Sequence, residues 1–277
     1  MTALGLPLPV LSRGRFASIE AYTDDALFEA VGVRIAFTGR SGGVSEGPFA
    51  SLNLGSHVND DPEAVQENRD RLVRAFAGDG TELLVPNQVH EDTVLCIDAI
   101  EHADEVREAA AQGADGLIVG AHSVAALLCF ADCVPVIIVS PTGRFAVVHA
   151  GWRGVMNAIS AKALRMMLER DALQETVHAE DYNVYIGPHI HRECFETSVE
   201  IHDQFVETFG RTCDAGHRHI DLSQALRVQL VEGGIAPERI CDVDICTVCH
   251  PDEFFSYRAQ QGTAGRHGAF AVKVASA

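Results

Sequence analysis

Four apolar runs in the middle of the chain constrain its fold more than any other feature of the sequence. None of them contains Asp, Glu, Lys or Arg. A strand with one face in water alternates apolar and polar side chains, whereas a strand covered on both faces is apolar throughout. The runs therefore predict strands buried on both faces, at residues 116–119, 125–131, 134–140 and 145–149.

Helix and strand patterns surround these runs, and no linker-like stretch divides the chain. Asp60 and Asp61 before Pro62 are typical of a helix start, and Gly233 and Gly234 of a helix end. We predict one α/β domain over residues 1–277, with a mixed sheet and helices packed outside it. Further strands are expected at 33–38, 82–85, 93–97, 183–186 and 240–245, helices at 62–76, 155–169, 198–209 and 222–231, and helix or polar loop at 103–112.

Charge and hydropathy exclude two classes of function. The formal net charge of -18 leaves no general basic character of the kind that a nucleic-acid-binding protein needs. The first ten residues have no basic segment before a long apolar one, and the apolar runs are far shorter than the ~18 residues that span a bilayer. We expect a cytoplasmic protein, a monomer or a homodimer, with its cysteines mostly reduced.

Three metal-binding side chains, His90, Cys133 and His149, each follow or end an apolar, strand-like run. Cys133 and His149 lie at the ends of consecutive predicted strands, so a hairpin would bring them together. Two imidazoles and one thiolate suit zinc or copper, and three protein ligands leave a position open for catalysis. The same Cys–His pair also suits a thiolate nucleophile activated by imidazole, and spacing does not separate the two.

Arginines beside glycines predict contacts with an anion. Arg40 lies in a glycine-rich turn, and Arg153 precedes a predicted helix, where backbone N–H groups favour negative charge. Arg258 and Arg266 lie close to two later glycines, and the planar guanidinium binds two phosphate oxygens. The turn also holds Ser45 in a Gly-x-Ser-x-Gly pattern, but the proline that follows disfavours the helix that a serine hydrolase needs there.

Two further patterns have ordinary explanations as well as functional ones. Cys246-Thr247-Val248-Cys249-His250 matches a haem attachment pattern, but that attachment requires export; with Cys241 these residues could hold a structural zinc, and core cysteines are the default. The two His-x-His pairs are too few for a multicopper cluster, so we expect surface or near-site histidines at His189, His191, His217 and His219.

Taken together, the ordered motifs resemble those of the laccase-domain purine nucleoside phosphorylase family, whose members are also named polyphenol oxidases and peptidoglycan editing factors. The resemblance spans residues 33–272. It rests on GGVSEGPFASLNLG at 42–55, NQVH at 87–90, ADG at 114–116, ADCVP at 131–135, HAGWRG at 149–154, IGP at 186–188 with CFE at 194–196, and CT at 246–247 with FSYR at 255–258 and GR at 265–266.

The resemblance implies a four-layer α/β/β/α fold with mixed sheets, related to toxins with a Cys–His catalytic pair. It implies zinc bound by His90, Cys133 and His149. It also implies phosphorolysis of adenosine, inosine and methylthioadenosine to the base and the corresponding (5-methylthio)ribose 1-phosphate, and deamination of adenosine. With Cys133, His90, His149 and Arg40 as catalytic residues, substrate and phosphate would contact Arg40, Asn53, Arg153, Arg258 and Arg266. Asp132 and Glu196 are the candidate proton shuttles.

Three other readings remain open from the sequence. The same pocket could serve a hydrolase that edits peptidoglycan precursors, with Cys133 or activated water as the attacking group. It could instead support copper-dependent phenol oxidation, as described for relatives of the family. In the third reading the chain is a binding or scaffold protein whose zinc is structural, and a fourth ligand comes from the cysteines within residues 241–249.

Overall fold

Two six-stranded sheets dominate the computed structural model, which describes residues 5–173 and 175–274. Sheet A has the order β1 (Ser12–Phe16), β2 (Ile19–Thr23), β3 (Val33–Thr38), β14 (His267–Lys273), β7 (Val124–Phe130) and β4 (Glu82–Leu84). Sheet B has the order β13 (Ile240–Asp242), β10 (Asn183–Ile186), β8 (Val134–Val139), β9 (Phe145–Ala150), β6 (Gly116–Val119) and β5 (Val94–Ile97). Both sheets are mixed, because β4 with β7, β5 with β6 and β10 with β13 are parallel and the other pairs antiparallel.

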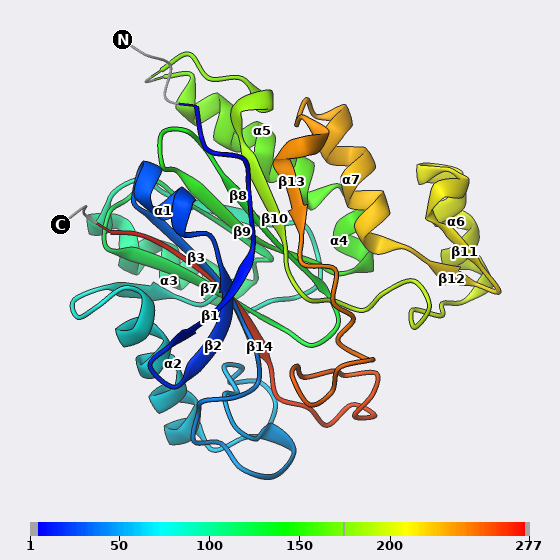
Figure 1. Cartoon of the computed structure of the whole chain (residues 1–277), viewed down its shortest axis with the longest axis horizontal. Helices are drawn as coiled ribbons and strands as arrows, with labels where there is room; N and C mark the ends of the chain where they lie inside the picture. The colour runs from blue at the N-terminus through cyan, green and yellow to red at the C-terminus, as the bar shows by residue number, and fades with distance from the viewer. Residues whose placement is uncertain (1–4, 174, 275–277) are drawn as a thin grey trace.

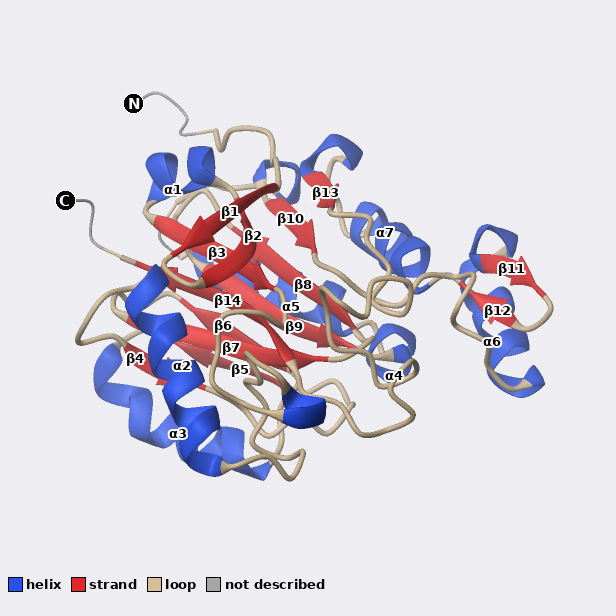
Figure 2. Cartoon of the chain, turned by 60° about the horizontal axis from the view of Figure 1, so that its bottom comes forward, coloured by secondary structure: helices blue, strands red, loops and turns tan. Residues whose placement is uncertain are grey.

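Helices cover the outer faces of the two sheets. Figure 2 shows α2 in front of the strands and α5 behind them, and in both views α6 and the small β-hairpin project from the side of the body (Figure 1). The helices are α1 (Asp25–Val31), α2 (Pro62–Phe76), α3 (Ala103–Gln112), α4 (Trp152–Met156), α5 (Ile159–Asp171), α6 (Val199–Phe209) and α7 (Leu222–Glu232), and the hairpin is β11 (Asp214–Gly216) with β12 (His219–Ile220). Short 3₁₀ turns occur at Gly47–Phe49, Ile100–His102, Ala179–Asp181, Arg211–Cys213 and Pro237–Arg239.

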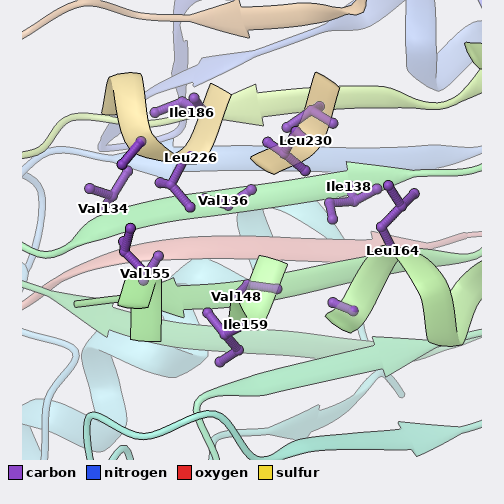
Figure 3. Close-up of a cluster of buried hydrophobic side chains, with 14 of the residues drawn as sticks. Val134, Val136, Ile138, Val148, Val155, Ile159, Leu164, Ile186, Leu226 and Leu230 are labelled. Atoms are coloured by element: carbon purple, nitrogen blue, oxygen red, sulfur yellow. The ribbon is translucent and has the colours of Figure 1, made fainter. Parts of the chain in front are cut away.

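Three apolar cores separate four layers. The outer face of sheet A packs on α2 through residues such as Leu127 and Leu72. The inner faces of the two sheets meet at a second core that includes Leu128 and Val147. The outer face of sheet B packs on α4, α5 and α7, where Val136 and Leu164 belong to one cluster (Figure 3). The expected four-layer α/β/β/α arrangement is confirmed.

The apolar runs are buried on both faces as predicted, for a reason that the pattern alone did not reveal. β7, β8 and β9 each have one face toward helices and the other toward the opposite sheet. Each fully buried Val, Leu or Ile side chain contributes about 1.5–3 kcal/mol relative to exposure. The sequence pattern suggested a single mixed sheet, but the strands form two sheets. One face of each of these strands is covered by the opposite sheet and not by a second layer of helices.

Several boundaries differ from the sequence prediction. The expected helix at 155–169 is two helices, α4 and α5, because Ala158 between them adopts a left-handed conformation with φ 55°. The strand expected at 240–245 ends at Asp242. Six helices and strands have no counterpart in the prediction: β1, β2, α1, β11, β12 and β14. No helix within the described ranges has the length and apolar character needed to cross a membrane.

Candidate metal and active site

The three predicted donors gather at one end of the interface between the sheets. His90 lies on the connection from β4 in sheet A to β5 in sheet B, and Cys133 on the connection from β7 in sheet A to β8 in sheet B. His149 lies on β9, opposite Pro135 of the β8–β9 hairpin. The ligand atoms of all three residues lie within 4.8 Å of one another. The hairpin argument for Cys133 and His149 is thus confirmed.

Asp115 positions two of the three donors through hydrogen bonds. Its carboxylate is completely buried, and Oδ1 lies 2.7 Å from Nδ1 of His149, which leaves Nε2 as the nitrogen that can face a metal. The same carboxylate accepts the backbone N–H groups of Val89, His90 and Glu91 at 3.2, 3.0 and 2.9 Å. One side chain therefore orients the ring of one donor and the loop of another, as carboxylates beside metal-binding histidines do.

The chain bends unusually around the donors. His90 itself and Asp132, directly before Cys133, have φ angles of 62° and 95°, which are rare for residues with a side chain. A Cβ atom at Gly151 would lie 3.3 Å from Cys133 Sγ and 3.4 Å from Cδ2 of His90. Backbone of this kind concentrates at functional sites, and here it keeps side-chain bulk away from the donors.

Cys133 and His149 shift each other's pKa in opposite directions. Burial opposes ionisation of Cys133, but the two histidines lower the pKa of its thiol to about 6. Burial likewise opposes the charged form of His149, but the Cys133 thiolate and Asp115 raise the pKa of this imidazole to about 9. At pH 7 the metal-free pair is therefore a thiolate beside an imidazolium, which suits either metal binding or nucleophilic attack.

A cavity of about 430 Å³ opens over the three donors. Its size lies in the range typical of small-molecule sites. Aromatic side chains from three separate segments, Trp152, Phe195 and Tyr257, contribute to its wall. Arg258 and Arg266 supply positive charge there, and His57, Gln88 and the acidic residue Asp132 are further polar residues of the lining. The cavity combines flat apolar surfaces with two guanidinium groups beside the donor set.

The two lining arginines are anchored by backbone carbonyls. Arg258 donates from Nη1 to Cys194 O at 3.0 Å and from Nη2 to Glu196 O at 3.2 Å. Arg266 donates from Nη1 to Ala264 O at 2.7 Å and to Gly265 O at 3.0 Å. These contacts hold both positive charges at the cavity wall, where the sequence analysis expected a substrate anion.

The other predicted substrate residues lie elsewhere. Arg40 donates to Ala50 O at 2.9 Å and to Pro251 O at 2.6 Å, and its guanidinium stacks on Phe255, so it joins two loops behind the cavity wall. Asn53 is buried, and its amide oxygen accepts the backbone N–H of Arg266 at 2.8 Å. Arg153 is exposed and stacks on the outside of Trp152.

The glycine-rich turn is packed against the protein rather than open to a ligand. The N–H groups of Gly42 and Gly43 donate to Ser51 Oγ, and that of Val44 to Asn68 Oδ1. A Cβ atom at Gly43 would lie 2.2 Å from Ser51 O, so glycine is required for this close approach. The hydroxyl of Ser45 accepts a hydrogen bond from the buried Asn68, which agrees with the sequence argument against a serine hydrolase.

The two candidate proton shuttles are both committed to other partners. Asp132 accepts Thr247 Oγ1 at 2.7 Å with one oxygen and the backbone N–H of Arg258 at 2.7 Å with the other. Glu196 pairs with Arg218. The sequence analysis did not single out His57, which lines the cavity and whose pKa is lowered by burial and by the charge of Arg266. Its position after the LNLG sequence of the glycine-rich motif was the only available signal.

The remaining histidine and cysteine motifs separate in space. His189 is buried and lies 2.8 Å from Gly187 O through Nδ1, so it is not a surface residue. His217 is exposed on the hairpin between β11 and β12, beside His219. Cys241 packs against the inter-sheet core, apart from Cys246 and Cys249.

Comparison with known proteins decides the family. The family described as "Multi-copper polyphenol oxidoreductase laccase" matches residues 34–273. The chain belongs to this family. It is 34% identical over 249 residues to purine nucleoside phosphorylase YlmD of Geobacillus stearothermophilus, covering 86% of this chain and 89% of the relative. The crystal structure of that protein superposes with a TM-score of 0.77 at 32% identity, over 88% of this chain and 93% of the other.

A second relative carries a different activity in its name. Adenosine deaminase RL5, from an unknown prokaryotic organism, is 31% identical over 228 residues, which cover 79% of this chain and 85% of the relative. Members of the laccase family with these names are enzymes, and this chain is therefore an enzyme. The donor set at His90, Cys133 and His149 fits a metal, because its two imidazoles and one thiolate converge beside a cavity.

Proposed function

We propose that the chain is a zinc-dependent enzyme of purine nucleosides. With phosphate it would cleave adenosine and inosine to the free base and ribose 1-phosphate, and methylthioadenosine to adenine and 5-methylthioribose 1-phosphate. It would also deaminate adenosine. The observation that carries the proposal is the convergence of His90, Cys133 and His149 at a cavity lined by aromatic side chains and two arginines. The activities named for the two relatives support the same substrate class.

In this proposal, different residues of the cavity bind the purine base and the phosphate. Phe195, Tyr257 and Trp152 offer flat surfaces on which a purine base can stack. Arg258 and Arg266 offer guanidinium groups to phosphate, which arginine binds through two parallel hydrogen bonds. Zinc, held by His90, Cys133 and His149, would supply a Lewis acid that polarises oxygen and activates water.

Proton transfer falls to His57 in this proposal. Burial and the positive charge of Arg266 keep its pKa below the ordinary value, so the imidazole is neutral at pH 7 and can accept a proton. Asp132 is the weaker candidate because both of its oxygens already accept hydrogen bonds. His57 therefore replaces Asp132 and Glu196 as the proposed shuttle.

An inosine assay with and without phosphate tests the proposal, together with the zinc content of the purified protein. We expect hypoxanthine release that depends on phosphate, and loss of this activity in Cys133→Ala along with its zinc. Circular dichroism of the variant should match that of the wild type, since Cys133 lies in a loop at the cavity. Base release that ignores phosphate, or activity retained by the variant, would contradict the proposal.

One observation favours a second candidate, a Cys–His hydrolase that edits peptidoglycan precursors. Asp115, His149 and Cys133 form a chain of carboxylate, imidazolium and thiolate, which is the order of groups in nucleophilic thiol enzymes. Cys133 would then attack an amide carbonyl, and the C–N bond would break as His149 gives its proton to the departing amine. Water would hydrolyse the resulting thioester and restore the thiol. Zinc-free protein that cleaves a muramyl amino acid amide and releases no base from inosine would establish this candidate instead.

A further inference from the structure

A second group of cysteines lies outside the donor set already described. The Sγ atoms of Cys194, Cys246 and Cys249 all lie within 4.8 Å of one another. An overlapping group with the same spacing consists of His191, Glu193 and Cys246, so Cys246 is shared by both groups. The sequence alone suggested Cys241 and His250 as partners of this motif, but the fold replaces them with Cys194 and His191, which come from a distant part of the chain.

Two tight turns present these four residues in pairs. In the first turn the backbone N–H of Cys194 donates to His191 O at 2.9 Å, and in the second that of His250 donates to Cys246 O at 3.1 Å. Backbone hydrogen bonds hold the turns side by side, from His189 N to Ile245 O at 3.2 Å and from Thr247 N to His189 O at 3.0 Å. The pairs are thus His-x-x-Cys and Cys-x-x-Cys, a spacing typical of structural zinc sites.

The distances suit a metal better than a disulfide. Cys194 Sγ and Cys249 Sγ are 3.6 Å apart. Sulfur atoms that share a tetrahedral zinc at about 2.3 Å lie roughly 3.8 Å from each other, whereas a disulfide requires about 2.05 Å. The backbone N–H of His191 points at Cys246 Sγ at 3.4 Å, as it would to stabilise a thiolate.

His191 has an unused nitrogen for such a site. Its Nε2 atom is buried, and none of the described residues gives it a hydrogen bond. Asp244 Oδ1 lies 3.9 Å from Nε2, and Glu193 Oε1 lies 3.6 Å from Nδ1. A buried imidazole nitrogen without a partner is costly, and coordination would satisfy it.

We propose that His191, Cys194, Cys246 and Cys249 bind a second zinc ion that fastens the wall of the cavity. Each thiol loses its proton when it coordinates the metal, so binding releases protons to solvent. Three soft sulfur donors with one imidazole select zinc over magnesium or calcium.

The site lies directly behind residues that line the cavity. Phe195 follows Cys194 in the chain, and the carbonyl of Cys194 accepts a hydrogen bond from Arg258. On the other turn, Thr247 follows Cys246 and donates to Asp132, which in turn accepts the backbone N–H of Arg258. A metal that joins the two turns would therefore fix Phe195 and Arg258 together.

Zinc content tests this site independently of activity and of the first donor set. We expect two zinc ions per chain in the wild type by plasma mass spectrometry, and one in each of Cys133→Ala and Cys249→Ser. Cys241→Ser is the matched control, because Cys241 is a free cysteine of the same region that packs against the inter-sheet core, and it should retain both ions. Cys249 is exposed, so serine at this position should not prevent folding.

The pattern of losses separates this proposal from the proposed function. If the wild type holds one zinc that is lost in Cys133→Ala and kept in Cys249→Ser, the second site does not exist. If its single zinc is lost in Cys249→Ser and kept in Cys133→Ala, the second site stands and zinc at the first is wrong.

Cobalt and thiol counting provide a second measurement. Cobalt added to metal-free Cys133→Ala should produce thiolate-to-cobalt absorption, and the further change Cys194→Ser should remove most of it. After zinc is chelated from wild-type protein under denaturing, non-reducing conditions, all eight cysteines should react with a thiol reagent. Two fewer reactive thiols, with no zinc released by Cys249→Ser, would show a disulfide in place of the metal site.

Discussion

At the scale of single residues, Asp115 does the most to shape the candidate metal site. It is completely buried, yet it forms contacts with the ring of His149 and with three consecutive backbone N–H groups of the His90 loop. These contacts lower its pKa in spite of its burial, so the carboxylate stays charged. A buried charge is stable only when it is hydrogen-bonded in this way.

Asp115→Asn should therefore weaken metal binding without removing a ligand. The amide keeps the shape of the carboxylate but has no charge. Its NH2 group can only donate hydrogen bonds, whereas both oxygens of Asp115 accept them. We expect zinc affinity to fall by about 10- to 100-fold, as for other carboxylates behind metal-binding histidines. Competition with a chromophoric chelator measures the change. Asp104→Asn, at an exposed carboxylate of α3, is the control and should bind zinc normally.

The sequence could predict the donor residues of this site but not the long-range contacts that hold its surroundings in place. Cys133 and His149 lie at strand ends and share a hairpin, and His90 lies in the connection between β4 and β5. Arg40 was expected to bind phosphate because arginine beside glycine suits anions. Its actual partner at Pro251 is 211 residues away, and no local pattern reveals such a contact.

At the scale of elements, burial decided which strands could be recognised. Runs such as β8 and β9 are apolar throughout and were predicted nearly to the residue. The edge hairpin of β1 and β2 was missed because β1 is mostly exposed and carries two arginines, and because each strand has only five residues. β14 was missed although it is central, because its first residues include a histidine and a glycine that weaken the apolar pattern.

The projecting element formed by α6, β11 and β12 is linked by an ionic contact that depends on pH. His202 on α6 lies 3.0 Å from Asp214 and 3.1 Å from Asp203, and hydrogen bonds to these carboxylates raise its pKa. A raised pKa stabilises the folded state fully below the unfolded value of about 6.5. The contribution disappears as the pH rises through the folded-state pKa.

His202→Ala should consequently lower the melting temperature at pH 5.5 and have little effect at pH 9. The shift should be small, because the carboxylates are partly exposed and water and salt screen the pair. Thermal unfolding of both proteins across this pH range measures it. His122→Ala, at an exposed histidine between β6 and β7, should show no such dependence; an equal shift at every pH would instead indicate lost packing.

At the scale of the whole molecule, the fold depends on close contact between the sheets. Gly187 follows β10 in sheet B, and a Cβ atom there would lie 2.3 Å from the ring of Phe37 in sheet A. Phe37 is fully buried in the inter-sheet core, so the ring has little room to move.

Gly187→Ala should reduce the free energy of unfolding by about 1–3 kcal/mol, the usual cost of overpacking a filled core. Urea unfolding followed by fluorescence and circular dichroism gives this value. Gly5→Ala is the control, since a Cβ atom there would meet nothing within 4 Å. An unchanged unfolding free energy for Gly187→Ala would mean that the sheets can separate slightly at no cost.

The order of strands in sheet A has a consequence for protein synthesis. β14 follows every other described strand along the chain, yet it lies between β3 and β7 and pairs with both. While a ribosome is still translating the segments before it, β3 and β7 have no partner between them, and their exposed edges resemble those on which aggregation begins. The centre of sheet A can therefore form only after β14 has been synthesised.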